Sequence, residues 1–520
     1  MQNNPSEGLD VLRALFMQKR FARVVELCNN LLQSEPDNPR VLEILALSLS
    51  NQQNEVQAQA VLEHAWRIAP DDPQICYNLA VTYQRTGDDA RAMLRYADCL
   101  RIRPRHTDAL WNYGELLRVS DHFSLAAECF EGILSEDAIY PDLYHRLAVC
   151  YAHLHRNDEA RDAFDKALDG NTTFTALTHW EYALFLLEIG EYADGFEHYE
   201  HRFEASVKTS VTAHPYTLPR WQGESLAGKT LLIHGEQGLG DEIMFASVIP
   251  ELVGEADRII IACRAPLARL FAESFPQCQV LPHAVHTQPA DLSKAGQIDF
   301  AVPIGSLCHY RRNTSEDFKK SSAGYLAFNQ REKSRFARLL ERLAPGSENE
   351  FKVGLMWGSN PAREVDWGAR RAARKSIPAT ELQILAECEG VRFISLQNRD
   401  NGAEAAEAPG LGIIDFQDYL NDFTDTAALI ANLDLVISVD TSVAHLAGAL
   451  SVPCRALLMT SADWRWGRYS DTTPWYDSVR LFRQSRQGDW RSVLEAVRAD
   501  ILLLTDCGVE DDSADSLPAR

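Results

Sequence analysis

Prolines and small residues recur at a fixed distance in the first half of the chain. Pro36, Pro70 and Pro104 are each 34 residues apart. Small residues repeat with the same spacing, in the series Ala46, Ala80, Gly114 and Ala148 and the series Ala58, Ala92, Ala126 and Ala160. This period constrains the fold most strongly, because such a unit is a pair of antiparallel helices that buries its apolar face only by stacking on its neighbours.

The 34-residue period is the signature of tetratricopeptide repeats, so we predict an all-α array over residues 1–205, with about six repeats. The first helices of such repeats line a concave groove that accepts extended peptides. Asn78 and Asn112 occupy equivalent positions facing that groove. An amide can both donate a hydrogen bond to a peptide backbone and accept one from it, so both asparagines are predicted to hold a bound polypeptide. The alternative is that two solvated asparagines share a register by chance.

The second half changes to short apolar strands, each followed by a turn and a helical segment. This alternation predicts α/β lobes with parallel sheets and helices on both faces. The predicted segments are a linker at 206–227, a first Rossmann-like lobe at 228–345, a second at 346–504 and an acidic disordered tail at 505–520.

One strand-to-helix turn is rich in glycine and runs from Gly235 to Asp241. Glycines there permit positive φ and close approach of another molecule, and a helix N-terminus favours anions. The spacing G-x-x-G-x-G differs from the dinucleotide fingerprint. We expect the Asp241 carboxylate to face the space between the lobes, and the alternative is that it caps the helix.

A second turn runs from Ser438 to Leu450. Thr441 and Ser442 at a helix start, together with free amides, predict a phosphate seat. His445 either donates a further hydrogen bond or is simply packed. The most basic run of the chain, residues 370–375, contains Lys375 and is expected to balance the charge of a leaving phosphate, unless it is only a solvated loop.

The composition of the chain limits the partners that it can bind and the compartment in which it is expected. Acidic residues outnumber basic ones by 74 to 51, for a formal charge of −23, which argues against nucleic acid and against an anionic membrane surface. No apolar run is long enough to insert stably in a bilayer, and no secretion signal is visible. Eleven cysteines without a C-x-x-C pair fit a reducing cytoplasm, so a cytoplasmic location is expected.

The ordered set of motifs resembles the two-lobed GT-B glycosyltransferases, specifically the heptosyltransferase-like branch linked to tetratricopeptide repeats. The architecture is also similar to bacterial soluble flagellin glycosyltransferases and to O-GlcNAc transferase. The matching elements are Gly235–Asp241, Val353–Trp357, Arg374–Pro378, Ile394–Gln397, Asp440–Leu446 and Asp463–Trp466.

The resemblance implies that Asp241 is the general base and that Lys375 balances the departing charge. It implies that the donor is held by Gly238, Gly240, Trp357, Arg374, Gln397, Asp440, Thr441, Ser442 and His445. No Asp-x-Asp pair is present in the second half of the chain, so neither a metal nor a cofactor is expected beyond a nucleotide-sugar co-substrate.

The resulting prediction is an inverting protein O-glycosyltransferase whose repeats present Ser or Thr of a protein acceptor. Flagellin and a CMP-activated nonulosonic acid are the specific pair that the resemblance favours. Two alternatives stay open: a glycolipid or polysaccharide transferase, and a non-catalytic scaffold or export adaptor. Trp464, Trp466 and Trp475 either stack on ligand or pack as a rim.

Overall fold

The computed structural model divides into two compact units, Met1–Thr178 and His179–Arg520. The described residues are 5–135, 140, 142–170, 175–205, 216–284, 289–346, 349–359, 373–397 and 408–510. Residues 206–215 of the predicted linker and 511–520 of the predicted tail lie outside these ranges.

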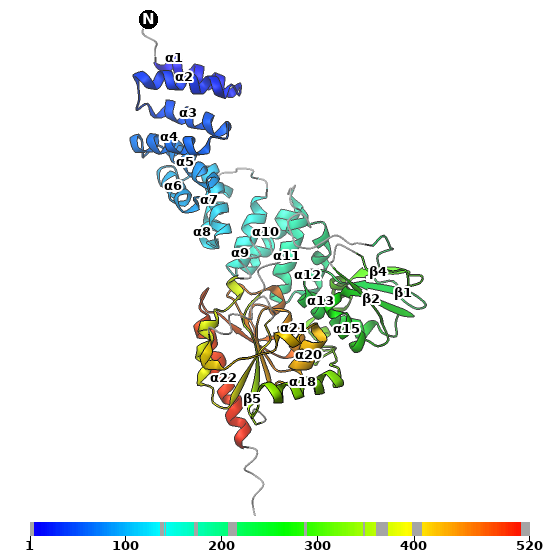
Figure 1. Ribbon diagram of the computed structural model, residues 1–520. Helices are drawn as coiled ribbons and strands as arrows, with labels where there is room; N and C mark the ends of the chain where they lie inside the picture. The colour runs from blue at the N-terminus through cyan, green and yellow to red at the C-terminus, as the bar shows by residue number, and fades with distance from the viewer. Residues whose placement is uncertain are drawn as a thin grey trace, which may run out of the picture. The chain divides into compact units, whose positions relative to one another are not determined.

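The first unit is a series of antiparallel helix pairs, coloured blue to cyan in Figure 1. Its helices are α1 (Pro5–Met17), α2 (Phe21–Ser34), α3 (Pro39–Asn51), α4 (Glu55–Ile68), α5 (Pro73–Arg85), α6 (Asp89–Ile102), α7 (Thr107–Val119), α8 (Phe123–Leu134), α9 (Leu143–His153) and α10 (Asn157–Asp169). This confirms the predicted helical array.

Pro36, Pro70 and Pro104 lie in the turns between repeats, and a second pair of prolines one period apart, Pro39 and Pro73, stands at helix starts. Asp72 caps α5, because its carboxylate accepts hydrogen bonds from the N–H groups of Gln74 and Ile75. Pro73 follows at the first helical position, where a missing N–H costs nothing. The same arrangement, an Asx cap followed by proline, starts α3 at Asn38.

The recurrent small residues lie where helices cross. Ala46, Ala58, Ala80 and Ala92 are all fully buried. A Cβ atom on Gly114 would come within 2.7 Å of the Phe130 ring. Small size at these positions therefore has the steric cause that the sequence period predicted.

The second unit begins with helical segments that the sequence prediction assigned to the array. Most of α11 (Thr175–Ile189), α12 (Tyr192–Tyr199) and the 3-10 turn η1 (Glu200–Phe203) belong to it. Phe196 and Tyr199 are buried in the same core as Phe245. The compact units thus divide earlier than residue 205, where the predicted boundary lies.

Within the described residues, four strands form the parallel sheet of the first lobe, in the order β3-β2-β1-β4. Residues 216–227 run into it, and the N–H of Trp221 donates to the carbonyl of Ala301 on β4. The lobe comprises β1 (Thr230–His234), α13 (Leu239–Phe245), η2 (Ala246–Val248), α14 (Ile249–Leu252), β2 (Arg258–Arg264), α15 (Ala265–Ser274), β3 (Gln279–His283), β4 (Phe300–Pro303), η3 (Ile304–Ser306), α16 (Leu307–Arg311), α17 (Ser315–Phe318) and α18 (Gln330–Leu343).

The second lobe has a larger sheet, with strand order β10-β11-β9-β8-β5-β6-β7 among the described residues. It is parallel except for β10, which pairs antiparallel with β11. Its elements are β5 (Phe351–Met356), η5 (Ala379–Glu387), β6 (Val391–Ser395), η7 (Pro409–Leu411), β7 (Ile414–Asp415), η8 (Gln417–Tyr419), α20 (Phe423–Ile430), β8 (Leu435–Val439), α21 (Ser442–Ala449), β9 (Cys454–Leu458), η9 (Trp464–Trp466), β10 (Thr472–Thr473), β11 (Tyr476–Arg483) and α22 (Trp490–Glu510).

Alternate residues of the second sheet face two separate cores. Val436 and Ala456 pack in one core with residues of α20 and α21, whereas Leu435 and Ile437 pack in another with residues of η5 and α22. Burial on both faces explains the continuous apolar runs of these strands. Together the two sheets confirm the predicted α/β fold of two Rossmann-like lobes.

The last helix, α22, extends to Glu510. The first residues of the predicted tail, 505–510, are therefore helical rather than irregular. None of the helices in the described ranges is both long and apolar enough to cross a bilayer.

Candidate active site

The glycine-rich turn joins β1 to α13 and carries Asp241 in the first turn of the helix. Gly238 is the N-cap residue, and its N–H donates to Oδ2 of Asp241 over 2.7 Å. Asp241 is therefore the third helical residue rather than the N-cap itself, and one of its carboxylate oxygens accepts from the N–H of the N-cap residue. The other oxygen, Oδ1, forms an ion pair with Nη2 of Arg465 from the second lobe.

The glycines of this turn act differently from the prediction. The residue with positive φ is Gln237, at 59°, and none of Gly235, Gly238 and Gly240 adopts that conformation. Their lack of a side chain instead admits other groups of this chain. A Cβ on Gly238 would lie 2.9 Å from Oδ2 of Asp241, and one on Gly240 would lie 3.0 Å from His445.

Arg465 lies in η9 and also pairs with Asp463. The side chains of Asp241 and Arg465 are 16% and 11% exposed. Burial disfavours the Arg465 cation, but Asp241 and Asp463 more than offset this, so the pKa of Arg465 lies above its ordinary value. Asp241 thus faces the second lobe, in a partly buried pair with Arg465.

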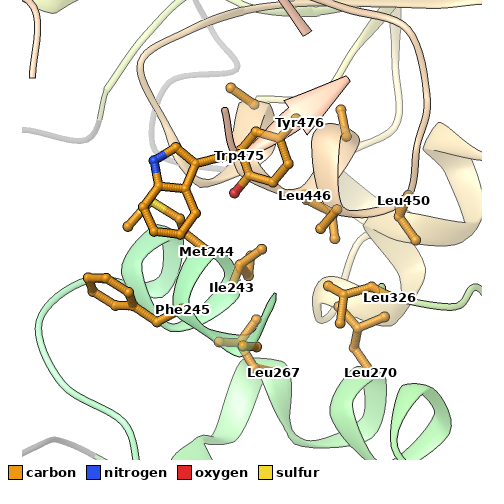
Figure 2. Packing of buried hydrophobic residues seen from close by; sticks show 14 of the residues in the cluster. Ile243, Met244, Phe245, Leu267, Leu270, Leu326, Leu446, Leu450, Trp475 and Tyr476 are labelled. Carbon is orange, nitrogen blue, oxygen red and sulfur yellow. The ribbon is translucent and has the colours of Figure 1, made fainter. Parts of the chain in front are cut away.

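The two lobes share an apolar core beside this pair. Met244 and Phe245 of α13 pack in one buried cluster with Leu446 of α21 and with Trp475 and Tyr476 (Figure 2). Full burial of each large apolar side chain contributes about 2 kcal/mol. This packing fixes the helix that carries Asp241 against the second lobe.

Lys375 lies at the start of α21, beside Asp440 of the second turn. Nζ of Lys375 lies 2.6 Å from Oδ2 of Asp440, and Nε1 of Trp466 donates to Oδ1 of Asp440 over 2.8 Å. Burial alone would raise the pKa of Asp440, but the Lys375 charge outweighs it and the pKa is lowered. Thr441 caps α21, where its Oγ1 accepts from the N–H of Val443, and Ser442 follows as the first helical residue.

His445 is packed. Its ring stacks on Trp466 with centroids 4.8 Å apart, and Nδ1 lies 3.0 Å from the hydroxyl of Tyr476. Burial lowers the pKa of His445 to about 4. The imidazole is therefore neutral at pH 7.

The three tryptophans beside this site are also buried. Trp464 packs against Phe245 and Trp475 and meets Tyr199 in an edge contact, while Trp466 lies between His445 and Asp440. All three are at most 6% exposed. They pack between the lobes, as the second of the two sequence interpretations expected.

The remaining predicted donor residues lie at the carboxyl edge of the second sheet, where ligands bind in open α/β sheets. Trp357 follows β5 and Gln397 follows β6, and both are buried. Oε1 of Gln397 accepts from the N–H of Gly358, whereas Nε2 of Gln397 and Nε1 of Trp357 have no hydrogen-bond partner among the described residues. Arg374 is exposed beside Lys375. Residues 370–372 of the basic run lie outside the described ranges. Among the described residues, no group of three or more His, Cys, Asp or Glu side chains could hold a metal ion.

The two predicted acceptor asparagines differ in the first unit. Asn78 is 7% exposed, and its Nδ2 donates to Oε1 of Glu43 over 2.9 Å, while Gln74 donates to its Oδ1. Asn112 is half-buried, and its Nδ2 donates to the hydroxyl of Tyr77. Both amides therefore join neighbouring repeats, and the groove that the structure describes has no open pair of asparagines.

The sequence prediction missed the residues that hold the Asp241 turn. Arg465 is the ion-pair partner of Asp241, 224 positions away. Arg202 and Tyr199 contact Glu236 and Gln237 of the turn. The motif Asp463–Trp466 was the one sequence signal, since it places an arginine between two tryptophans.

Comparisons with known proteins agree with this architecture. Models described as tetratricopeptide repeat match residues 15–75, 73–106 and 141–169. The model of glycosyltransferase family 9 (heptosyltransferase) matches residues 421–489, which include Asp440, His445 and Arg465.

Two relatives extend the comparison. Protein FlbA of Caulobacter vibrioides is 30% identical over 456 residues, which cover 83% of this chain and 73% of that protein. The peroxisomal targeting signal receptor of Candida albicans is 28% identical over 180 residues, 32% of this chain and 29% of that protein. The crystal structure of MamA protein covers 32% of this chain and 92% of its own, with 17% identity and a TM-score of 0.30, too low to bear on the fold. Repeats, family match and the long alignment to FlbA together show that the chain belongs to the glycosyltransferases linked to tetratricopeptide repeats.

Proposed function

We propose that this glycosyltransferase transfers a sugar from a nucleotide-sugar donor to a Ser or Thr hydroxyl of a protein acceptor, with inversion at the anomeric carbon and without a metal. The observation that carries the proposal is the contact between Asp241 of the first lobe and Arg465 of the second, beside the pair of Lys375 and Asp440. An acid and two cations from different lobes meet at the start of α21, as proton removal and leaving-group stabilisation require.

Asp241 is the proposed base. A carboxylate has about four lone-pair sites on its two oxygens. The N–H of Gly238 and the guanidinium of Arg465 use two of them, so an acceptor hydroxyl can bind without breaking either contact. As the hydroxyl oxygen bonds to the anomeric carbon, its proton passes to Asp241.

The leaving group departs on the side of the second lobe. The bond between the anomeric carbon and the phosphate oxygen breaks, and that oxygen keeps the electron pair. Lys375 would stabilise this charge, assisted by the free amides at the Thr441–Ser442 helix start. Nε2 of Gln397 and Nε1 of Trp357 are buried donors at the same sheet edge that have no partner among the described residues, which supports a polar ligand there.

A protein acceptor is the part of the proposal that rests on the repeats. Arrays of this kind bind extended peptides, and Asn112 retains partial exposure on the array. Flagellin and a CMP-activated nonulosonic acid are the first pair to test. Ten of the eleven cysteines are free thiols, which supports a cytoplasmic site of action.

Co-expression with flagellin in cells that make a CMP-activated nonulosonic acid tests the proposal. We expect the intact mass of flagellin to rise by whole glycosyl residues only when this protein is present, with the added mass on Ser or Thr. A glycosylated lipid or polysaccharide with unmodified protein would instead identify a glycolipid transferase. Absence of any glycosylated product would favour a scaffold.

A further inference from the structure

Glu236 and Gln237 lie in the turn between β1 and Asp241, yet the proposed mechanism uses neither. Glu236 is 3% exposed. Its Oε2 accepts from Nε of Arg202 and its Oε1 from Nη2, each over 2.8 Å. The N–H of Gly305 also donates to Oε1. A fully engaged carboxylate therefore ties the turn to η1, the segment that follows α12.

Arg202 is as completely engaged as its partner. The residue is fully buried, and its remaining bonds go to the carbonyl of Tyr199, the carboxylate of Glu200 and the hydroxyl of Ser306. A buried ion pair is costly unless every donor and acceptor is satisfied, so this pair tolerates one geometry of the turn.

Gln237 makes a second connection to the same helical segment. Its Nε2 donates to the hydroxyl of Tyr199 over 2.6 Å. Its Oε1 accepts from Nη2 of Arg465 over 3.4 Å, and the same Nη2 contacts Asp241. Tyr199, Gln237, Arg465 and Asp241 thus form an unbroken series of polar contacts.

We infer that Tyr199 and Arg202 are positioning residues for the base, because they fix Gln237 and Glu236 and through them the orientation of Asp241 against Arg465. Tyr199 ends α12 and Arg202 lies in η1, the last helical elements described before the first sheet, and both elements belong to the second unit. This segment is consequently part of the transferase machinery rather than only the end of the repeat array. The inference rests on the proposed role of Asp241.

Two substitutions in the full chain test it, with flagellin and a CMP-activated nonulosonic acid as probes. Tyr199→Phe removes one hydroxyl and leaves the buried ring, and Arg202→Lys keeps the charge but loses the two-pronged contact with Glu236. We expect kcat to fall about tenfold in each, with the KM for the donor changed by less than about twofold, since the donor side is untouched. Gln237→Leu should lower kcat similarly, and adding it to Tyr199→Phe should cause little further loss.

Arg312 provides a matched control. It is another fully buried arginine, it pairs with Glu251, and it has no contact with the turn among the described residues. Arg312→Lys should lower thermal stability while kcat stays within twofold. If Tyr199→Phe and Arg202→Lys both keep the kcat of Arg312→Lys, the positioning role is overturned, and should Arg202→Lys fail to fold, Tyr199→Phe decides alone. Full turnover by Asp241→Asn would instead overturn the proposed role of Asp241 as the base, and the absence of transfer by the wild type would overturn the proposed function.

Discussion

The two units use polar side chains in opposite ways. In the repeat array, polar contacts connect neighbours one period apart, such as Asn78 with Glu43 and Asn112 with Tyr77, each 35 positions apart. In the α/β unit, charged pairs connect elements far apart in sequence, and Asp241 with Arg465 spans 224 positions. A repeat can therefore lose one such contact locally, whereas the second unit loses a connection between lobes. This difference sets the expected size of each substitution.

Arg465→Met should have the largest effect on stability. It leaves Asp241 and Asp463 partly buried without their cation, and breaking a buried pair costs about 3–5 kcal/mol in the free energy of unfolding. Urea denaturation of the full chain measures this. Arg491→Met is the control, because Arg491 is 76% exposed and pairs with the exposed Glu495, so its loss should cost less than about 1 kcal/mol. Equal losses would show that the pair between the lobes has no special weight.

Lys375→Ala should follow, with an effect on catalysis. Removing a charge that stabilises the leaving group lowers kcat by about 10²–10³-fold. Lys229→Ala breaks another lysine–aspartate pair, that of Lys229 with Asp299, away from the proposed site. Lys229→Ala should transfer sugar at about the wild-type rate, so the rates of the two variants should differ by about 10²–10³-fold. Comparable rates would place Lys375 outside the reaction.

The pH dependence of stability should reveal the burial of His445. Its folded pKa of about 4 lies below the ordinary 6.5. The unfolded chain therefore binds a proton first, and the free energy of unfolding falls as pH drops from 6.5 towards 4, by up to about 3 kcal/mol for this group. Denaturation at several pH values should show a smaller acid loss in His445→Asn than in the wild type. Parallel curves would mean that the imidazole reaches solvent.

Asn78→Ala and Asn112→Ala should have the smallest effects, because each removes a contact between neighbouring repeats. Asn78 is buried, and its loss leaves Oε1 of Glu43 without this donor, which costs about 1–3 kcal/mol in the free energy of unfolding. Asn112 is half-buried, and its loss should cost less than about 1 kcal/mol. Binding of flagellin to the same variants should weaken more for Asn112→Ala. The reverse order in both measurements would restore Asn78 as the residue facing an acceptor.

Local features of this chain could be predicted from sequence, and distant pairings could not. Pro73 after Asp72, and the small residues Ala80 and Gly114, act within one or two helices, so period and composition identify them. The strands and both turns followed from apolar runs ending in glycine or hydroxyl residues. Placement of Lys375 beside Asp440 also agrees with the expected charge-balancing role, which remains a proposal.

The missed features depend on tertiary packing. Nothing in the spacing of Arg465 or Arg202 shows that they pair with Asp241 and Glu236, because such contacts are set by how the lobes and η1 pack. Positive φ was expected at the glycines of the first turn, and Gln237 adopts it instead. The turn itself can be recognised in the sequence, whereas the residues that contact it cannot.

Transfer by Asp241→Asn, measured beside Asp317→Asn, tests the role of Asp241 most directly. Asp317 also accepts a hydrogen bond from its N-cap residue, Thr314, so both variants perturb a helix cap and only one lies at the proposed site. We predict that Asp241→Asn lowers kcat by about 10²–10⁴-fold with donor affinity retained, while Asp317→Asn transfers sugar at the wild-type rate. Equal, undiminished transfer by the two variants would contradict the assignment of Asp241 as the base.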